Sequence, residues 1–152
     1  MRAEYIKPFL TATNDVFKLM LDMEPQRKDM RVVDDMIASG DANVILGITG
    51  DLQGSVFLGF SREMALEMVK IMSGMDMNVI DSFASSALGE IGNIIAGNAL
   101  SGLEEAGFIC DIVPPQVFIG EYKAFPLAGN QALLLSLTTP IGGFDVSVFL
   151  AG

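Results

Sequence analysis

Histidine is absent from this chain and cysteine occurs once. Without histidine the chain cannot build a Ser-His-Asp or Cys-His catalytic site or carry phosphohistidine, and it lacks a ligand that most zinc sites use. The lone Cys110 excludes an internal disulfide, and it falls in an apolar run that favours a buried, inert thiol. Any chemistry therefore has to use carboxylates, amides, hydroxyls or a metal held by oxygen ligands.

Basic residues are scarce as well. Nine Lys and Arg stand against 19 Asp and Glu, which gives a net charge of −10. The chain has no Lys/Arg cluster, so nucleic acid and anionic membrane are poor partners, and a basic protein surface is a better electrostatic match. The N-terminus has no basic-then-apolar signal pattern. The longest uncharged run, 124–144, is broken by Pro126, Asn130 and Pro140, so we expect no membrane span and a cytoplasmic location.

The bulk composition predicts one folded domain over residues 1–152. Apolar residues make up 51% of the chain and charged residues 18%, without a low-complexity tract. A chain of this length buries roughly two thirds of its unfolded surface. Disorder is therefore not expected.

Three helices are predicted from apolar residues at helical spacing. The first covers residues 5–23 and ends at Glu24-Pro25, because a residue before proline is pushed out of the helical region. Ser61 caps the second, which runs to residue 73. Asn78 is expected to cap a long central helix that includes 82–101, and Gly102 to close it.

Apolar runs between turn signals predict the strands. These are residues 31–39, 43–49, 54–60, 107–113, 117–120, 131–139 and 144–150. The polar stretch 26–29 is interpreted as a linker, and Gly50-Asp51 as the turn of a hairpin. Pro114-Pro115 must interrupt the hydrogen-bond ladder, so the strand is expected to end or bend there.

The last strand pair repeats the pattern of the earlier hairpin. Leu46-x-Ile48 followed by SVFL at 55–58 recurs as Leu135-x-Leu137 followed by SVFL at 147–150. The order helix, strand, hairpin thus occurs twice. We predict an internally duplicated α+β fold, with long helices packed on a largely antiparallel sheet.

Two further patterns admit a structural and a functional interpretation. Met64, Met68 and Met72 recur every four residues; packing in the core is favoured over a Met-rich interface. The adjacent Asp34 and Asp35 suggest a metal site, but successive strand residues point to opposite faces. A loop or edge position is therefore favoured for both.

The central helix carries the most unusual pattern, because between Asp81 and Glu104 its single charge is Glu90. Its apolar side gathers Ala84, Leu88, Ile91 and Ile95. Its other side gathers Ser82, Ser86, Gly89, Glu90, Asn93 and Gly97. Glu90 and Asn93 share this face with β-carbons roughly 5–6 Å apart, and their small neighbours leave room for a partner surface.

A Glu and an Asn on the wet side of a helix need no function, but an ordinary solvated face carries several charges. The glycines are also costly, at about 1 kcal/mol each against Ala in a helix interior. Close packing behind the helix would explain Gly92. Gly89 and Gly97 lie beside the Glu90/Asn93 face, where close approach by a partner is the simpler reason.

Ser86-x-x-x-Glu90-x-x-Asn93, within ALGEIGNIIAGNAL, resembles the signature of the CheC/CheX/FliY chemotaxis phosphatases. That signature is Asp or Ser, three residues, Glu, two residues, Asn, and a proline further on. Pro115 fits the proline position with a slip of one residue. CheX-like members carry the motif once, on the long middle helix, as this chain does.

The resemblance implies a CheC-like fold and a phosphatase that acts on the aspartyl phosphate of a CheY-like response regulator in chemotaxis or another two-component pathway. Asn93 would orient the attacking water, and Glu90 would pair with the receiver's active-site lysine. Ser86, Gly89 and Gly97 would form the contact surface. Mg²⁺ would come with the receiver, so the chain would need no metal or cofactor of its own. The resemblance also implies a homodimer, built by strand exchange or sheet extension.

Two rival functions stay open. A binding module of the same fold could dock a response regulator or the flagellar switch without hydrolysis. A carboxylate-metal hydrolase could use Asp34, Asp35, Asp41 or Asp51, although these residues need not converge and match no known oxygen-ligand loop.

Overall fold

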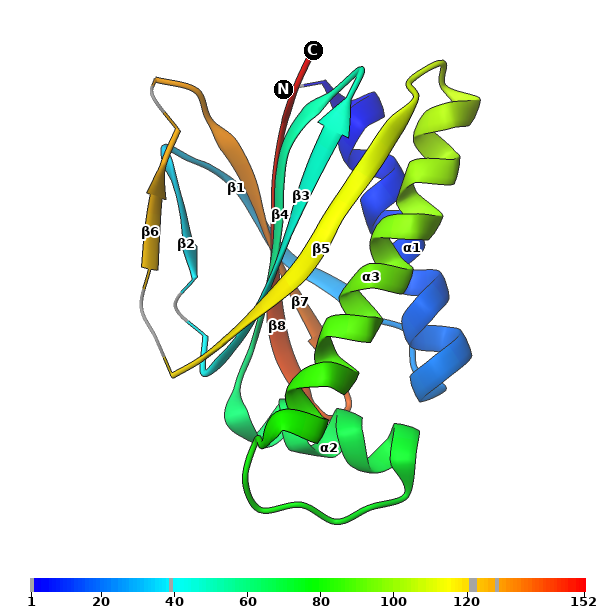
Figure 1. The fold of residues 1–152 in the computed structure, drawn as a ribbon, viewed down its shortest axis with the longest axis vertical. Coiled ribbons are helices and arrows are strands. Elements are labelled where there is room, and N and C mark those ends of the chain that lie inside the picture. The colour runs from blue at the N-terminus through cyan, green and yellow to red at the C-terminus, as the bar shows by residue number, and fades with distance from the viewer. Residues whose placement is uncertain (1, 39, 121–122, 128) are drawn as a thin grey trace.

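The structure, a computed structural model, describes residues 2–38, 40–120, 123–127 and 129–152 (Figure 1). The elements in chain order are α1 (Ala3–Leu21), β1 (Gln26–Val33), β2 (Asp35–Ala38), β3 (Ala42–Gly50), β4 (Gln53–Phe60), α2 (Arg62–Ser73), α3 (Ser82–Glu105), β5 (Cys110–Ile119), β6 (Lys123–Pro126), β7 (Ala132–Thr139) and β8 (Gly142–Ala151). Within these described residues, no helix is both long and apolar enough to cross a membrane.

An antiparallel six-stranded sheet forms the centre of the molecule, in the order β1-β7-β8-β4-β3-β5. The helices α1 and α3 lie side by side over one face of this sheet (Figure 1). The two-stranded β2–β6 ribbon stands on the other side, and α2 lies at the end where α3 begins. The predicted α+β class with helices on an antiparallel sheet is confirmed.

The strand order of the sheet is symmetric about its centre. Exchanging β1 with β5, β3 with β7 and β4 with β8 gives the same order in reverse. At the centre, β4 pairs with β8 so that Val56 lies opposite Val148. Both valines belong to the repeated SVFL, and their neighbours pair crosswise, Ser55 with Phe149 and Phe57 with Ser147. The sequence repeat therefore marks two related halves that meet along their last strands.

The core fills the space between the helices and the sheet, where apolar burial supplies the main driving force for folding. Phe17 of α1 stacks on Phe144 of β8 with ring centroids 4.7 Å apart. Met64 and Met68 are fully buried and Met72 packs against the same core, which confirms the packing interpretation of the methionine stripe. Cys110 is half-buried rather than buried.

Helix ends follow the predicted chemistry at α2 but not at α3. The Ser61 hydroxyl accepts a hydrogen bond from the Met64 amide at 3.1 Å, and Gly74 ends α2 in the left-handed conformation at φ 75°. Asn78 is not the cap of α3; Asp81 is, accepting from the Ala84 amide at 2.9 Å. The Asn78 carbonyl instead accepts a hydrogen bond from the Arg62 guanidinium, which ties the linker between α2 and α3 to the start of α2.

The prediction that Gly102 closes the central helix is wrong, because α3 continues to Glu105. A β-carbon at position 102 would lie 3.1 Å from the Pro8 Cβ. Gly102 therefore allows α1 and α3 to approach closely at this crossing.

The two edge strands depart most from the sequence prediction. Residues 26–29 are not a linker but the start of β1, which pairs with β7 along its whole length. Predicted strand 31–39 is divided between the end of β1 and β2, and its last residue lies outside the described ones. Because β1 is an edge strand with exposed side chains, its sequence lacks the apolar alternation of a half-buried strand.

The prolines do not end β5, which runs through both of them as one strand. β5 forms the opposite edge of the sheet, where a missing N–H costs no ladder bond. Its register against β3 shifts between Ile45 and Gly47, so one extra residue is accommodated as a bulge. The expected bend is therefore present, without a break. The strand β6, which was not predicted, follows β5 in the chain and pairs with β2.

Candidate active site on α3

The two faces of α3 divide as the sequence predicts except at Gly89, which is buried rather than on the outer face. Its buried residues include Ala84, Leu88, Ile91 and Ile95, which pack on the core. On the opposite side Ser86 and Glu90 are exposed, and Asn93 is half-buried. Asp81 fixes the start of the helix through its side-chain cap. The packed face thus holds Glu90 and Asn93 at a constant position on the surface.

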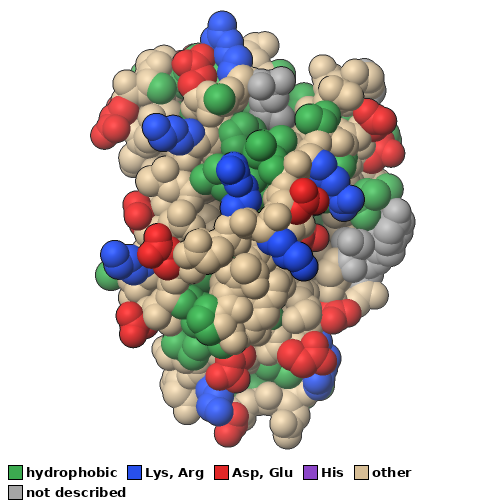
Figure 2. Space-filling view, turned by 180° about the vertical axis from the view of Figure 1, so that it is seen from behind, with side chains coloured by type: hydrophobic (Ala, Val, Ile, Leu, Met, Phe, Trp, Pro, Cys, Tyr) green, Lys and Arg blue, Asp and Glu red, His purple; other side chains and the backbone are tan. Residues whose placement is uncertain are grey.

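The carboxylate of Glu90 and the carboxamide of Asn93 are available to a partner. Within the described residues, neither side chain has a hydrogen-bond or ion-pair partner. They are separated by three residues on one helix, so their β-carbons lie about 5–6 Å apart. The other side of the molecule, seen in Figure 2, instead scatters charges of both signs among polar and apolar side chains. The α3 face is distinct in presenting one anionic group and one amide together.

The three glycines of this region have different surroundings. A β-carbon at Gly92 would lie 2.7 Å from the Val44 Cγ1, which confirms close packing behind the helix. A β-carbon at Gly97 would meet no atom within 4 Å. Gly89 is buried, and a β-carbon there would lie 3.4 Å from Val117 and 3.8 Å from Pro115. Gly97 thus opens onto free space, whereas Gly89 adjoins the chain's own β5.

A shallow depression lies beside Glu90, between α3 and β5. Its lining residues are Ser85, Ser86, Gly89, Glu90, Pro115 and Val117. Sequence reasoning singled out Ser86, Gly89 and Glu90 but assigned no site role to Val117. Pro115 had a signal, since it occupies the proline position of the family signature, but nothing in the sequence placed it against α3. The structure brings it there because β5 follows α3 and packs along it.

The acidic residues of the rival metal site do not form one. Among the described residues, no group of three or more His, Cys, Asp or Glu side chains is placed to hold a metal ion. Asp41 accepts from the Arg62 amide at 2.9 Å, and Asp51 accepts from the Ile109 amide at 2.7 Å. Asp34 accepts from the Gln131 side chain. These carboxylates tie loops to neighbouring segments, so nothing here favours a metal-dependent hydrolase.

Comparison with known proteins gives consistent results. The family described as "Chemotaxis phosphatase CheX" matches residues 42–135. The protein named "CheY-P phosphatase CheX" from Thermotoga maritima is 34% identical over 121 residues, which are 79% of this chain and 78% of that protein. A CheC-like superfamily protein from Shewanella sp. PV-4 superposes with a TM-score of 0.90 at 25% identity, over 100% of both chains.

A further solved structure contains a bound partner. The crystal structure of the CheX-CheY-BeF3-Mg+2 complex from Borrelia burgdorferi matches with a TM-score of 0.77 at 28% identity, covering 99% of this chain and 100% of that one. The family match, the identity to the Thermotoga protein and the shared fold agree. The chain therefore belongs to the CheX family of chemotaxis phosphatases.

Proposed function

We propose that this chain is a response-regulator phosphatase that hydrolyses the aspartyl phosphate of a CheY-like receiver, with Glu90 and Asn93 as its acting residues. The observation that carries the proposal is the pair itself: an exposed carboxylate and a half-buried carboxamide, both unpartnered within the described residues, on a helix face without other charge between Asp81 and Glu104. Membership of the CheX family supplies the substrate class.

Asn93 positions the water. A carboxamide donates through its NH₂ group and accepts through its oxygen, so it can hold a water in one orientation at any pH. The water oxygen attacks phosphorus, the bond from phosphorus to the aspartyl oxygen breaks, and the products are a free carboxylate and inorganic phosphate. Positioning is the main catalytic task in such a transfer. The half-buried position of Asn93 on α3 supports this role, because packing of the helix limits where the carboxamide can lie.

Glu90 holds the receiver. Its exposed carboxylate pairs with the receiver's active-site lysine through a charge-assisted hydrogen bond, which fixes the register of the two proteins. Mg²⁺ comes with the receiver; the Borrelia complex, which contains CheY, beryllofluoride and Mg²⁺, supports this arrangement. The chain itself then contributes orientation and water placement and needs no cofactor of its own.

The test is phosphate release from an acyl-phosphorylated CheY-like receiver, with wild type, Asn93→Ala and Glu90→Ala side by side. Wild type should accelerate release, Asn93→Ala should lose about 100-fold in rate while still binding, and Glu90→Ala should bind about tenfold more weakly. A wild type that binds the receiver without speeding release would make the chain a docking module. A full rate for Asn93→Ala would refute the assigned role.

We place this reaction in the cytoplasm, where response regulators are phosphorylated, and we expect a homodimer. β1 is an edge strand of the six-stranded sheet, and its Met30 and Val32 are 49% and 61% exposed. An exposed edge of this kind can extend the sheet into a second copy. Sedimentation equilibrium should give twice the chain mass, and a monomer across the micromolar range would contradict the expectation.

A further inference from the structure

Phe83 stands apart from the other phenylalanines of the chain. All ten lie among the described residues, and Phe83 alone is exposed, at 47%. It occupies the first turn of α3, two residues after the capping Asp81. A partner that covers this ring would gain the free energy of burying it.

The ring lies in line with the proposed site. Phe83 precedes Glu90 by seven residues, or about two helical turns, so both side chains leave α3 on nearly the same side, about 10 Å apart along the axis. Ser86 lies between them on that stripe, and the depression lined by Pro115 and Val117 adjoins it. A receiver seated on Glu90 and Asn93 therefore extends over Phe83.

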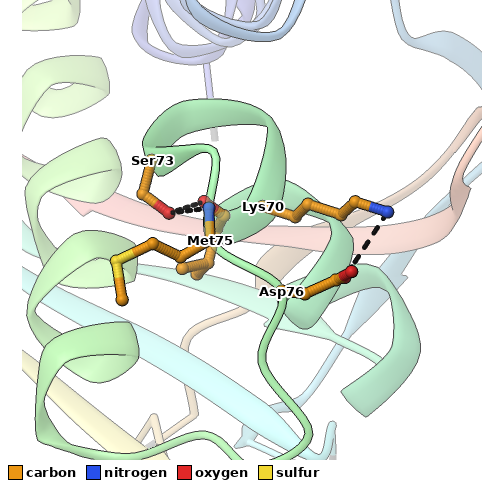
Figure 3. Close-up of polar contacts among 5 residues, drawn as sticks. Lys70, Ser73, Met75 and Asp76 are labelled. Carbon is orange, nitrogen blue, oxygen red and sulfur yellow. Dashed lines mark hydrogen bonds and ion pairs between the residues drawn. The ribbon is translucent and has the colours of Figure 1, made fainter.

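The linker between α2 and α3, residues 74–81, is tied to the end of α2. The Ser73 hydroxyl accepts from the Met75 amide at 3.1 Å, and Lys70 of α2 pairs with Asp76 at 3.4 Å (Figure 3). Met75 and Val79 of this linker are also exposed, at 51% and 66%. Exposed apolar side chains thus occur both in the linker and in the first turn of α3.

We propose that Phe83 is an apolar anchor for the phosphorylated receiver and determines how tightly the receiver is held while Glu90 and Asn93 act. This inference rests on the proposed function. Phe83 is a positioning residue, since it lies two turns from the reacting atoms. Its contact differs from that of Glu90 in kind: salt screens an ion pair near the surface, whereas apolar burial is not screened.

The first measurement is affinity for a CheY-like receiver activated with beryllofluoride and Mg²⁺, at 50 mM and 500 mM salt. Phe83→Ala should weaken binding about tenfold at both salt concentrations, and Phe83→Leu should restore most of the loss. The loss in Glu90→Ala should shrink at the higher salt. In steady-state hydrolysis Phe83→Ala should raise KM about tenfold and leave kcat within about twofold. Leu19→Ala, which removes an 85% exposed side chain on α1, is the matched control and should change nothing.

A second measurement does not depend on the stability of the alanine variant. The chain contains no tryptophan, so Phe83→Trp introduces a unique fluorophore. Its emission should shift to the blue when a tryptophan-free activated receiver is added, whereas Leu19→Trp should show no shift.

The outcomes separate the two proposals. Suppose that wild type binds and hydrolyses the receiver, that Phe83→Ala has the same affinity and rate, and that the emission of Phe83→Trp does not shift. The proposed role of Phe83 is then wrong, and the proposed phosphatase function is unaffected. If wild type neither binds nor hydrolyses, the proposed function fails first. An emission shift that follows chain concentration without receiver would assign this surface to a second copy and overturn the anchor.

Discussion

The exposed faces of α1 and α3 differ, although the two helices hold related places in the two halves of the fold. One exposed stripe of α3 contains Phe83, Ser86, Glu90, Asn93 and Gly97. The residues with the same spacing on α1 are Glu4, Lys7, Thr11, Asn14 and Lys18. An asparagine thus stands at the same place on both stripes, but α1 has charges where α3 has Phe, Ser and Gly.

The buried faces, in contrast, perform the same task. Phe9, Val16 and Phe17 of α1 pack on the sheet as Leu88 and Ile91 of α3 do. Packing restricts what a buried face can contain, and it places no such restriction on the exposed one. A site on a helix therefore consists of more than its reacting residues, because between Asp81 and Glu104 the α3 face also carries no charge except Glu90.

Moving the Glu-x-x-Asn pair to α1 should have the largest effect. Thr11→Glu places a carboxylate three residues before Asn14. Combined with Asn93→Ala, it should leave phosphate release about 100-fold below wild type, because Lys7 lies four residues before the new carboxylate and pairs with it, and Lys18 lies four residues after Asn14. Thr11→Glu alone should release phosphate at the wild-type rate. Recovery to within tenfold of wild type would mean that Glu-x-x-Asn suffices on any exposed helix.

Making α3 resemble α1 should have the next largest effect. Ser86→Lys places an ammonium one turn before Glu90, as Lys7 stands one turn before Thr11. The lysine would pair with Glu90 in the same helix and would bring a second charge into the interface, where its desolvation costs free energy. Affinity for the activated receiver should fall about tenfold, equivalent to about 1.4 kcal/mol. Ser86→Ala is the control and should stay within about threefold; equal affinities for both variants would show that the cleared face is irrelevant.

The sequence predicted those parts of the fold in which burial imposes a regular spacing of apolar residues. The apolar side of α3 and the stripe of Met64 and Met68 follow helical spacing, and the hairpins follow strand and turn signals. The edge strands were predicted only in part: β1 was expected from residue 31 onward, and β5 was divided into strands 107–113 and 117–120. β1 is exposed over nearly all its length, and Pro114 is tolerated in β5 only because that strand has one free edge. Strand order within a sheet is a tertiary property that local patterns do not contain.

The candidate site, too, could be predicted from the sequence only in part. Glu90 and Asn93 could be found from the sequence because both lie on one helix, whose geometry fixes their spacing. Pro115 and Val117 could not be placed, since their contact with Gly89 depends on how β5 packs along α3. Gly102 was misassigned for the same reason, because its partner Pro8 lies on α1.

The buried side of α3 can be tested at Gly92. A β-carbon there would lie 2.7 Å from Val44 Cγ1 and 3.3 Å from Leu46 Cδ1, both of them fully buried. Val44 is β-branched and cannot move aside cheaply. Crowding of this kind costs about 1–3 kcal/mol, and the better helix propensity of alanine returns about 1 kcal/mol. Gly92→Ala should therefore lower the free energy of unfolding by about 1 kcal/mol in urea denaturation, and an increase would contradict the close approach of α3 to β3.

The exposed side gives the smallest and most discriminating effect, at Gly97. Beyond its chain neighbours and the adjacent backbone of α3, no described atom lies within 4 Å of a β-carbon at Gly97. Gly97→Ala therefore gains helix propensity without crowding and should raise the free energy of unfolding by up to about 1 kcal/mol. If the receiver approaches closely at this turn, the added methyl group should nevertheless weaken its binding about threefold. Stability and affinity would then change in opposite directions in one variant, whereas Gly92→Ala should lose stability alone. Higher stability with unchanged affinity would show that the receiver does not contact α3 at Gly97, and binding would then not explain the glycine at this position.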